Sequence, residues 1–126
     1  MGLTFIPVRG SRFEFIDPAE LVLAPSRKAE PLDPVFLALC DPIIMRAIQV
    51  VRVRYTGEGG DILPTALPGV NRQLNVGQEY TLILDGVRRA QAARRLGHPR
   101  IYVLILDFPS WEAVEDHLSS NKEKTT

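Results

Sequence analysis

Residues 81–106 read TLILDGVRRAQAARRLGHPRIYVLIL, and this stretch decides the fold. An apolar run stops at Asp85-Gly86 and leads directly into a segment rich in alanine and arginine. Gly97 followed by Pro99 is typical of a helix end, because glycine accepts the left-handed conformation there and proline cannot continue the helix. A second apolar run then begins. The pattern predicts a central strand, a helix and another central strand, over residues 79–84, 87–96 and 100–107.

The sequence on either side supplies shorter elements. Alternating apolar and polar residues predict a strand with one solvent-facing side over residues 49–55. A last helix is predicted after Ser110, a good N-cap residue. Its apolar face carries Trp111, Val114 and Leu118. A short edge strand or hairpin is expected within residues 3–16, and a turn or helical start at Asp17-Pro18. A helix is expected after Pro34, broken at Pro42, and a long loop is expected over residues 56–78. Together these elements predict an α+β fold, a small mixed sheet with helices packed around it.

The composition is that of one ordinary globular domain. The chain has 126 residues, 45% hydrophobic and 24% charged, so we expect one domain over residues 1–120 and a polar, disordered tail over 121–126. Fifteen Lys and Arg balance fifteen Asp and Glu, so attraction to nucleic acid must come from local clustering. No segment approaches the roughly 20 apolar residues of a membrane helix, and the first residues lack the apolar core of a signal peptide. The expected location is the cytoplasm.

Neither the cysteine nor the histidines predict a metal site. Cys40 is the only cysteine, which excludes an internal disulfide, and its apolar surroundings predict a buried structural thiol. His98 follows the helix end and is expected to be structural, whereas His117 is expected to be exposed on the last helix. The two histidines are too far apart in sequence to form a recognisable metal-binding set.

The turn between the first apolar run and the helix has the parts of an anion-binding site. Gly86 lets a ligand approach the backbone closely. The first amides of the helix, at Val87, Arg88 and Arg89, lack intrahelical acceptors and carry the positive end of the helix dipole. Arginine also binds phosphate in a bidentate fork. The alternative is a solvated amphipathic helix whose arginines only face water.

Two further features of this region bear on the hypothesis. Helical spacing predicts a polar face and a packing face, made respectively of Arg88, Gln91 and Arg95, and of Ala90, Ala93 and Leu96. Asp85 is the acid at the turn. It is expected to cap the helix, to coordinate a Mg²⁺ carried by a nucleotide, or to accept a proton from a substrate hydroxyl, and these roles are compatible.

The stretch from Tyr80 to Leu106 resembles the second conserved box of the ParB/sulfiredoxin-like superfamily. In that box an apolar strand leads into Gly-(Glu or His)-Arg-Arg, an alanine-rich helix, Leu-Gly, a short loop and another strand. IDPAELVLAPSRKAEPLDP at residues 16–34 resembles the first box, and residues 34–55 resemble the helix and strand between the boxes. The resemblance spans roughly residues 15–107 and is most specific in the second box. It implies the small mixed α+β fold of that superfamily.

In that superfamily the second-box turn holds the phosphates of a nucleotide, which is CTP in the partition proteins, ATP in sulfiredoxins and ADP in a free-serine kinase. The resemblance therefore implies a phosphate-binding site at Gly86, Val87, Arg88 and Arg89, with a Mg²⁺ that accompanies the nucleotide. It also implies a second basic contribution from the first-box loop, from Arg27 and Lys28, with Arg46 as a weaker candidate.

The position after the glycine departs from the family pattern. Val87 stands where the partition proteins and the kinase have Glu, and where sulfiredoxins have their catalytic Cys. Valine cannot activate water, orient a metal or take a proton, which argues against sulfiredoxin chemistry. The absence of a helix-turn-helix region argues against partition-type CTP switching. Asp85 is then the candidate catalytic residue, and whether the chain is an enzyme stays open.

Three functions are compatible with these residues. The first is a bacterial nucleotide-binding domain, either a phosphotransfer or nucleotide-hydrolysing enzyme or a binder without catalysis. The second is a ParB-like nuclease or toxin domain that binds DNA or RNA through a stripe of arginines, drawn from Arg52, Arg54, Arg72, Arg88, Arg89, Arg94, Arg95 and Arg100. Few aromatic residues accompany these arginines in the sequence, so base stacking is not expected. The third is a non-catalytic, partition-like adaptor. A homodimer is compatible with all three.

Overall fold

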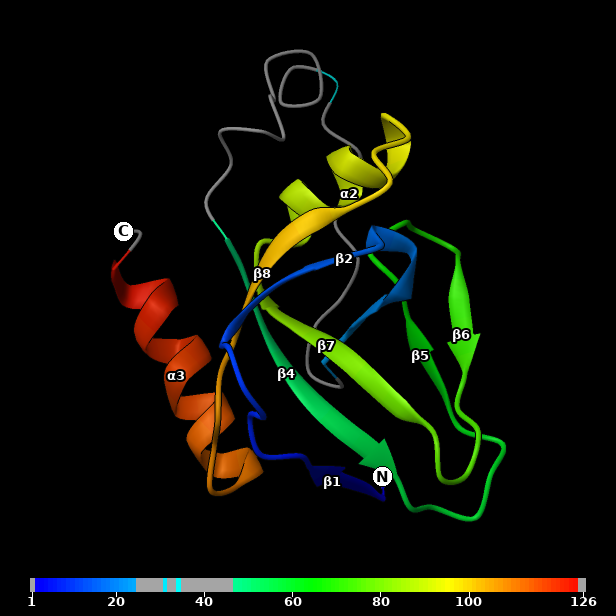
Figure 1. The fold of residues 1–126 in the computed structure, drawn as a ribbon, viewed down its shortest axis with the longest axis vertical. Helices are drawn as coiled ribbons and strands as arrows, with labels where there is room; N and C mark the ends of the chain where they lie inside the picture. The colour runs from blue at the N-terminus through cyan, green and yellow to red at the C-terminus, as the bar shows by residue number, and fades with distance from the viewer. Residues whose placement is uncertain (1, 25–30, 32–33, 35–46, 125–126) are drawn as a thin grey trace.

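A computed structural model describes residues 2–24, 31, 34 and 47–124 of the chain. In chain order the elements are β1 (Leu3–Phe5), β2 (Phe13–Ile16), the short 3-10 helix η1 (Pro18–Glu20), β3 (Leu21–Leu23), β4 (Ile48–Tyr55), β5 (Ile62–Pro64), β6 (Asn71–Gln73), β7 (Glu79–Asp85), α2 (Val87–Arg95), β8 (Ile101–Ile105) and α3 (Trp111–Lys124) (Figure 1). The predicted helix after Pro34 lies outside the described residues, as do Arg27, Lys28, Cys40 and Arg46.

The described strands form one mixed six-stranded sheet and a separate two-stranded sheet. The order in the main sheet is β2-β8-β4-β7-β3, and β1 also pairs with β4. The β4–β8 and β3–β7 pairs are parallel, whereas the other pairs are antiparallel. This arrangement confirms the predicted α+β class with a small mixed sheet. It also places β7 and β8 inside the sheet, as their continuous apolar sequences predict.

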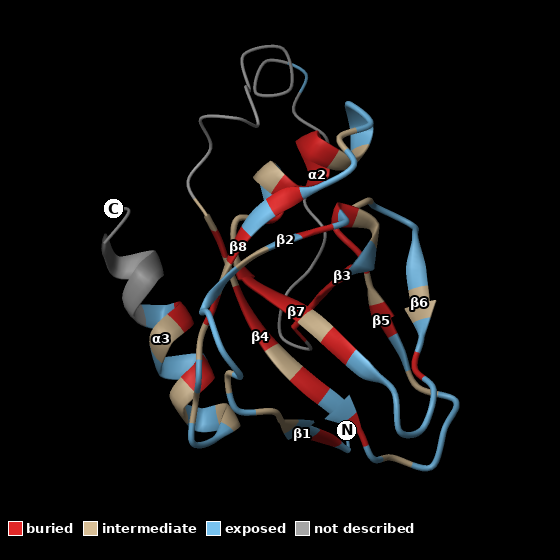
Figure 2. Cartoon of the chain, in the orientation of Figure 1, coloured by how far each residue is buried: buried red, intermediate tan, exposed pale blue. Residues whose placement is uncertain are grey.

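Helix α3 covers one face of the sheet and completes the first of two hydrophobic cores, the α3-side core (Figure 2). Val114 and Leu118 are buried in it with residues of β4 and β7, and Trp111 packs at its margin. This confirms the predicted apolar face of the last helix. The Ser110 hydroxyl accepts a hydrogen bond from the amide three residues later, as expected of an N-cap. Residues 121–124, expected in a polar tail, continue the helix.

Helix α2 contributes to the second core, the α2-side core, together with residues of β4, β7 and β8. Val87, Ala90 and Ala93 are buried there, and the small alanines let the helix lie close to the sheet. Gly97 has a φ of 75°, which confirms the predicted helix end at a left-handed glycine. Leu96, predicted to pack with the alanines, is exposed instead and is the C-cap residue that follows Arg95.

The N-terminal segment forms two strands that do not pair with each other. β1 pairs with β4, whereas β2 pairs with β8 at the end of the sheet. Between them the Ile6 amide donates to the Arg52 carbonyl, and the Val8 amide donates to the Asp107 carboxylate, both at 2.9 Å. The chain therefore crosses from β4 towards β8. The predicted edge strand is confirmed, and the alternative of a hairpin is wrong.

The expectation of a long loop over residues 56–78 is also wrong. This segment contains the β5–β6 hairpin, and its Leu63 and Leu74 are buried in the α3-side core. At the start of the segment, the buried hydroxyl of Tyr55 donates a hydrogen bond to the Asp61 carboxylate. That bond, and then burial, raise the pKa of Tyr55 above its ordinary value. Glycine and proline bend this segment, but its leucines and Tyr55 anchor it to the core.

Candidate functional site

The turn between β7 and α2 is made by Gly86, which has a φ of 107°. A side chain here would be strained, and its Cβ would lie 2.9 Å from Arg89 Nη2 and 3.0 Å from Ile48 Cγ1. Gly86 is itself the N-cap of α2, and it makes no side-chain cap hydrogen bond. The prediction that Asp85 caps the helix is therefore wrong, because this residue is still the last residue of β7. The first amides of α2 are left without a side-chain acceptor from the cap.

Asp85 pairs with Arg89 instead of capping the helix. Arg89 Nη2 lies 3.5 Å from Asp85 Oδ2, and Arg89 Nη1 donates to the Ala47 carbonyl at 3.4 Å. The arginine side chain is 19% exposed and the aspartate side chain 49%. The guanidinium thus lies over the glycine turn, in the space that the missing Cβ leaves. It is held between a carboxylate and the end of the chain that leads into β4.

Val87 points away from this turn and into the protein. Its side chain is 2% exposed and belongs to the α2-side core. The position that carries Glu or Cys in the ParB/sulfiredoxin-like superfamily, which this stretch resembles, is therefore a core position in this chain. Val87 can offer a ligand its backbone amide but no side-chain chemistry.

The predicted polar face of α2 is wrong at Gln91. Arg88 and Arg95 are exposed, but Gln91 is buried and its amide donates to the Ala66 carbonyl at 3.1 Å. The reason is the phase of the helix. Once Val87 is in the core, a residue four positions later lies on the same side. Gln91 therefore connects α2 to the segment between β5 and β6.

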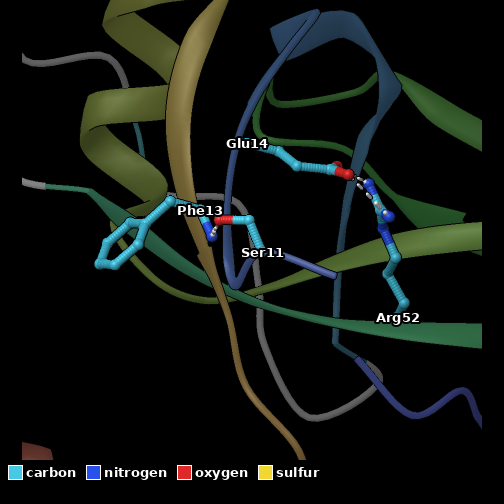
Figure 3. Close-up of polar contacts among 4 residues, drawn as sticks. All are labelled: Ser11, Phe13, Glu14 and Arg52. Carbon is cyan, nitrogen blue, oxygen red and sulfur yellow. Dashed lines mark hydrogen bonds and ion pairs between the residues drawn. The ribbon is translucent and has the colours of Figure 1, made fainter. Parts of the chain in front are cut away.

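Several arginines considered for a nucleic-acid stripe have partners elsewhere. Both terminal nitrogens of Arg52 on β4 donate to the Glu14 carboxylate on β2, which gives a bidentate ion pair (Figure 3). Arg54 pairs with Glu79 at 3.0 Å. Arg72 donates to the Ala19 and Glu20 carbonyls at the end of η1. These three arginines come from different parts of the fold and serve local contacts.

The described residues contain no group of three or more His, Cys, Asp or Glu side chains that could hold a metal ion. His117, expected to be exposed, is half-buried and shares a hydrogen bond of 2.8 Å with the Gln49 side chain. A cavity of about 400 Å³ lies between β1 and the segment before α3, with Phe5, Val51 and Phe108 in its lining. Neither Gly86 nor its neighbours line it.

One surface feature was not expected from the sequence. Phe13 and Phe15 of β2 and Tyr102 of β8 form an exposed cluster of rings. The residues are far apart in the chain and meet only through the β2–β8 register, which places Phe15 opposite Tyr102. The alternation Phe-Glu-Phe was the available signal, since it places both rings on one face of a strand.

Comparison of the chain with protein-family models, with curated proteins and with solved structures finds no match. Within the part of the chain that the structure describes, no helix is both long and apolar enough to cross a membrane.

Proposed function

We propose that this chain binds the phosphate groups of a nucleotide at the N-terminus of α2. The observation that carries the proposal is a nine-residue helix that begins at a left-handed glycine with no side-chain cap, beside the exposed Arg88. The N-terminal amides of a helix and the positive end of its dipole are suited to an oxyanion. The resemblance of residues 80–106 to the second box of the ParB/sulfiredoxin-like superfamily supports CTP, ATP or ADP as the source of the phosphate.

Each residue of the turn has its own role in the proposal. Gly86 leaves the space that the Arg89 guanidinium occupies over the turn, and the amides of Val87, Arg88 and Arg89 donate to the phosphate oxygen. The exposed Arg88 guanidinium adds a charged fork. Arg27 and Lys28 enter through the resemblance alone, as a second basic contribution from the first-box loop.

The Asp85 carboxylate competes with a bound phosphate for the Arg89 guanidinium. A phosphate that binds Arg89 takes the place of the Asp85 carboxylate, or leaves Asp85 to contact a Mg²⁺ carried by the nucleotide. One half-exposed carboxylate fits that second role, because nucleotide-bound Mg²⁺ keeps several waters and needs only one or two protein oxygens. The metal would neutralise phosphate charge.

Nucleotide binding without turnover is the form of the proposal that Val87 favours. A buried valine supplies no acid or base, so a phosphotransfer or hydrolysis reaction would have to depend on Asp85. The nuclease alternative has less support, because Arg52, Arg54 and Arg72 serve local contacts instead of a shared stripe.

The test is thermal unfolding of the wild type and of Arg88→Ala with CTP, ATP, ADP and GTP, each with and without Mg²⁺. A ligand at about 100 times its Kd stabilises the folded state by about 2.7 kcal/mol. We expect one nucleotide to raise the melting temperature of the wild type and to lose most of this effect in Arg88→Ala. Arg95→Ala, an exposed arginine at the other end of α2, is the matched control and should respond like the wild type. No shift with any nucleotide, or equal shifts in both variants, would overturn the proposal.

A further inference from the structure

The exposed ring cluster occupies one corner of the main sheet. Phe13, Phe15 and Tyr102 are 45%, 63% and 40% exposed. The rings of Phe13 and Tyr102 are stacked with their centroids 5.2 Å apart, and those of Phe15 and Tyr102 are 4.8 Å apart. Three contacting aromatic side chains that remain this open to water are typical of an interaction surface.

The backbone peptide groups of Phe13 and Phe15 lie on the open edge of the sheet. β2 is the last strand in the order, and the Ile105 amide donates to the Arg12 carbonyl at 2.7 Å. In an antiparallel pair the peptide groups alternate in direction. Those of Arg12, Glu14 and Ile16 therefore face β8, and those of Phe13 and Phe15 face outward. An edge strand with outward peptide groups is a template for another strand.

The opposite end of the sheet is closed. Every residue of β3 is buried, and Val22 forms an isolated antiparallel bridge with Thr65. Of the two terminal strands in the sheet order, β2 is the one with exposed side chains, and no described strand pairs with its outer edge.

Ser11 partly protects this edge. Its hydroxyl accepts a hydrogen bond from the outward-facing Phe13 amide at 3.1 Å, while the Glu14 side chain points to the other face and pairs with Arg52 (Figure 3). The serine thus satisfies one peptide group that a neighbouring strand would otherwise take. The Phe13 amide can exchange this single hydrogen bond to the hydroxyl for a hydrogen bond to a neighbouring strand.

We propose that β2 pairs antiparallel with β2 of a second copy of this chain, around a two-fold axis at Phe13. Residues that lie opposite each other in an antiparallel pair have side chains on the same face of the sheet. The two-fold axis must therefore pass beside a residue and not between two residues, which allows axes at Phe13, Glu14 or Phe15. The axis at Phe13 places Arg12 opposite Glu14 of the second copy, twice. The axis at Glu14 would place the two glutamates opposite each other, where like charges are unfavourable. Charge complementarity therefore selects the first register.

Arg12 and Glu14 are available for this contact. Arg12 is about half exposed and its ion pair with Asp107 is long, at 3.7 Å. Glu14 is held by Arg52 but its side chain is 38% exposed. On the other face, the two ring clusters would join into one aromatic stripe across the axis. This interface is distinct from the turn at Gly86, and it stands or falls independently of nucleotide binding.

The test is sedimentation of the whole chain over a range of concentrations. We expect the average mass of the wild type to rise from that of one chain to that of two. Phe13→Lys places like charges across the axis and should weaken association about tenfold or more. Ile62→Lys makes the same kind of change at an exposed apolar residue of β5 and should associate like the wild type. Circular dichroism melts check that each variant folds.

Ser11→Ala supplies a test in the opposite direction. Removing the hydroxyl leaves the Phe13 amide without its intramolecular acceptor, so association should become several-fold tighter. A wild type that stays monomeric at every concentration would overturn the proposal and leave the β2 edge to a strand of some other protein. Equal association of Phe13→Lys and Ile62→Lys would overturn it as well, because the second copy would then bind elsewhere.

Discussion

Arg89 and Asp85 face each other across the first turn of α2, with Nη2 and Oδ2 3.5 Å apart. The pair joins the last residue of β7 to the third residue of the helix, directly over Gly86. The candidate anion site therefore already contains an anionic group, the Asp85 carboxylate. Partly exposed ion pairs contribute little to stability, about 1 kcal/mol or less. The pair is better suited to regulating access to the arginine than to holding the fold together.

Asp85→Asn should release Arg89 for an external anion. In the absence of Mg²⁺ we expect the affinity for inorganic phosphate or for the preferred nucleotide to rise several-fold, with a change in unfolding free energy of about 1 kcal/mol or less. Isothermal titration calorimetry measures the affinity. Glu79→Gln, which removes a carboxylate from the ion pair with Arg54, is the control and should leave binding unchanged. Weaker binding by Asp85→Asn would contradict the competitor role.

Gly86→Ala should destabilise the protein by about 2 kcal/mol or more. The residue has a φ of 107°, and the new Cβ would lie 3.0 Å or less from Ile48 and Arg89. Gly97→Ala is a close comparison, since this glycine has a φ of 75° with no heavy atom near the added Cβ. It should lose only about 1 kcal/mol. Urea unfolding measures both, and equal losses would show that the crowding at Gly86 relaxes without penalty.

Val87→Glu should unfold the protein instead of creating a catalytic site. The side chain is 2% exposed and lies in the α2-side core. An unpaired carboxylate there would cost several kcal/mol or remain protonated. Val87→Leu and Val87→Ile change only the apolar shape and serve as controls. Thermal unfolding distinguishes the outcomes, and a stable Val87→Glu with new nucleotide turnover would show that this residue can rotate towards the turn.

The stability of the protein should fall in alkali through Tyr55. Its pKa is raised in the folded state by the hydrogen bond to Asp61 and by burial. The neutral phenol is therefore favoured by folding, and its contribution is complete below the ordinary pKa, about 10. Stability is lost as the pH rises from that value through the folded-state pKa. Tyr55→Phe should flatten this alkaline decline in urea unfolding, whereas Tyr102→Phe, at an exposed position, should keep it.

The β7–α2–β8 unit could be predicted from sequence because its signals are local. An apolar run, a glycine and an alanine-rich helix follow one another in the chain, and the structure confirms each element. The outward position of Arg88 and the inward position of Ala90 are also set by spacing within one helix. The mixed α+β class follows from the same kind of local pattern.

Several errors arose where residues distant in sequence decide the structure. Gln91 is buried because Val87 fixes the phase of α2 against the sheet, which spacing alone does not specify. The segment over residues 56–78 is anchored by contacts of Leu63 and Leu74 with other elements. The ring cluster likewise depends on a strand register between β2 and β8. No periodicity within either strand predicts that they would be neighbours.

The pairing of β2 with β8 also has a consequence for how the chain folds. It joins Phe13 to Leu104, so nearly the whole described chain must be assembled before the sheet order is complete. Contacts between residues so distant in sequence slow the search for the native state, because the intervening loop must close first. During synthesis on the ribosome, β2 has no partner until β8 emerges. Its two phenylalanines then lack the neighbouring Tyr102 ring until β8 has been made.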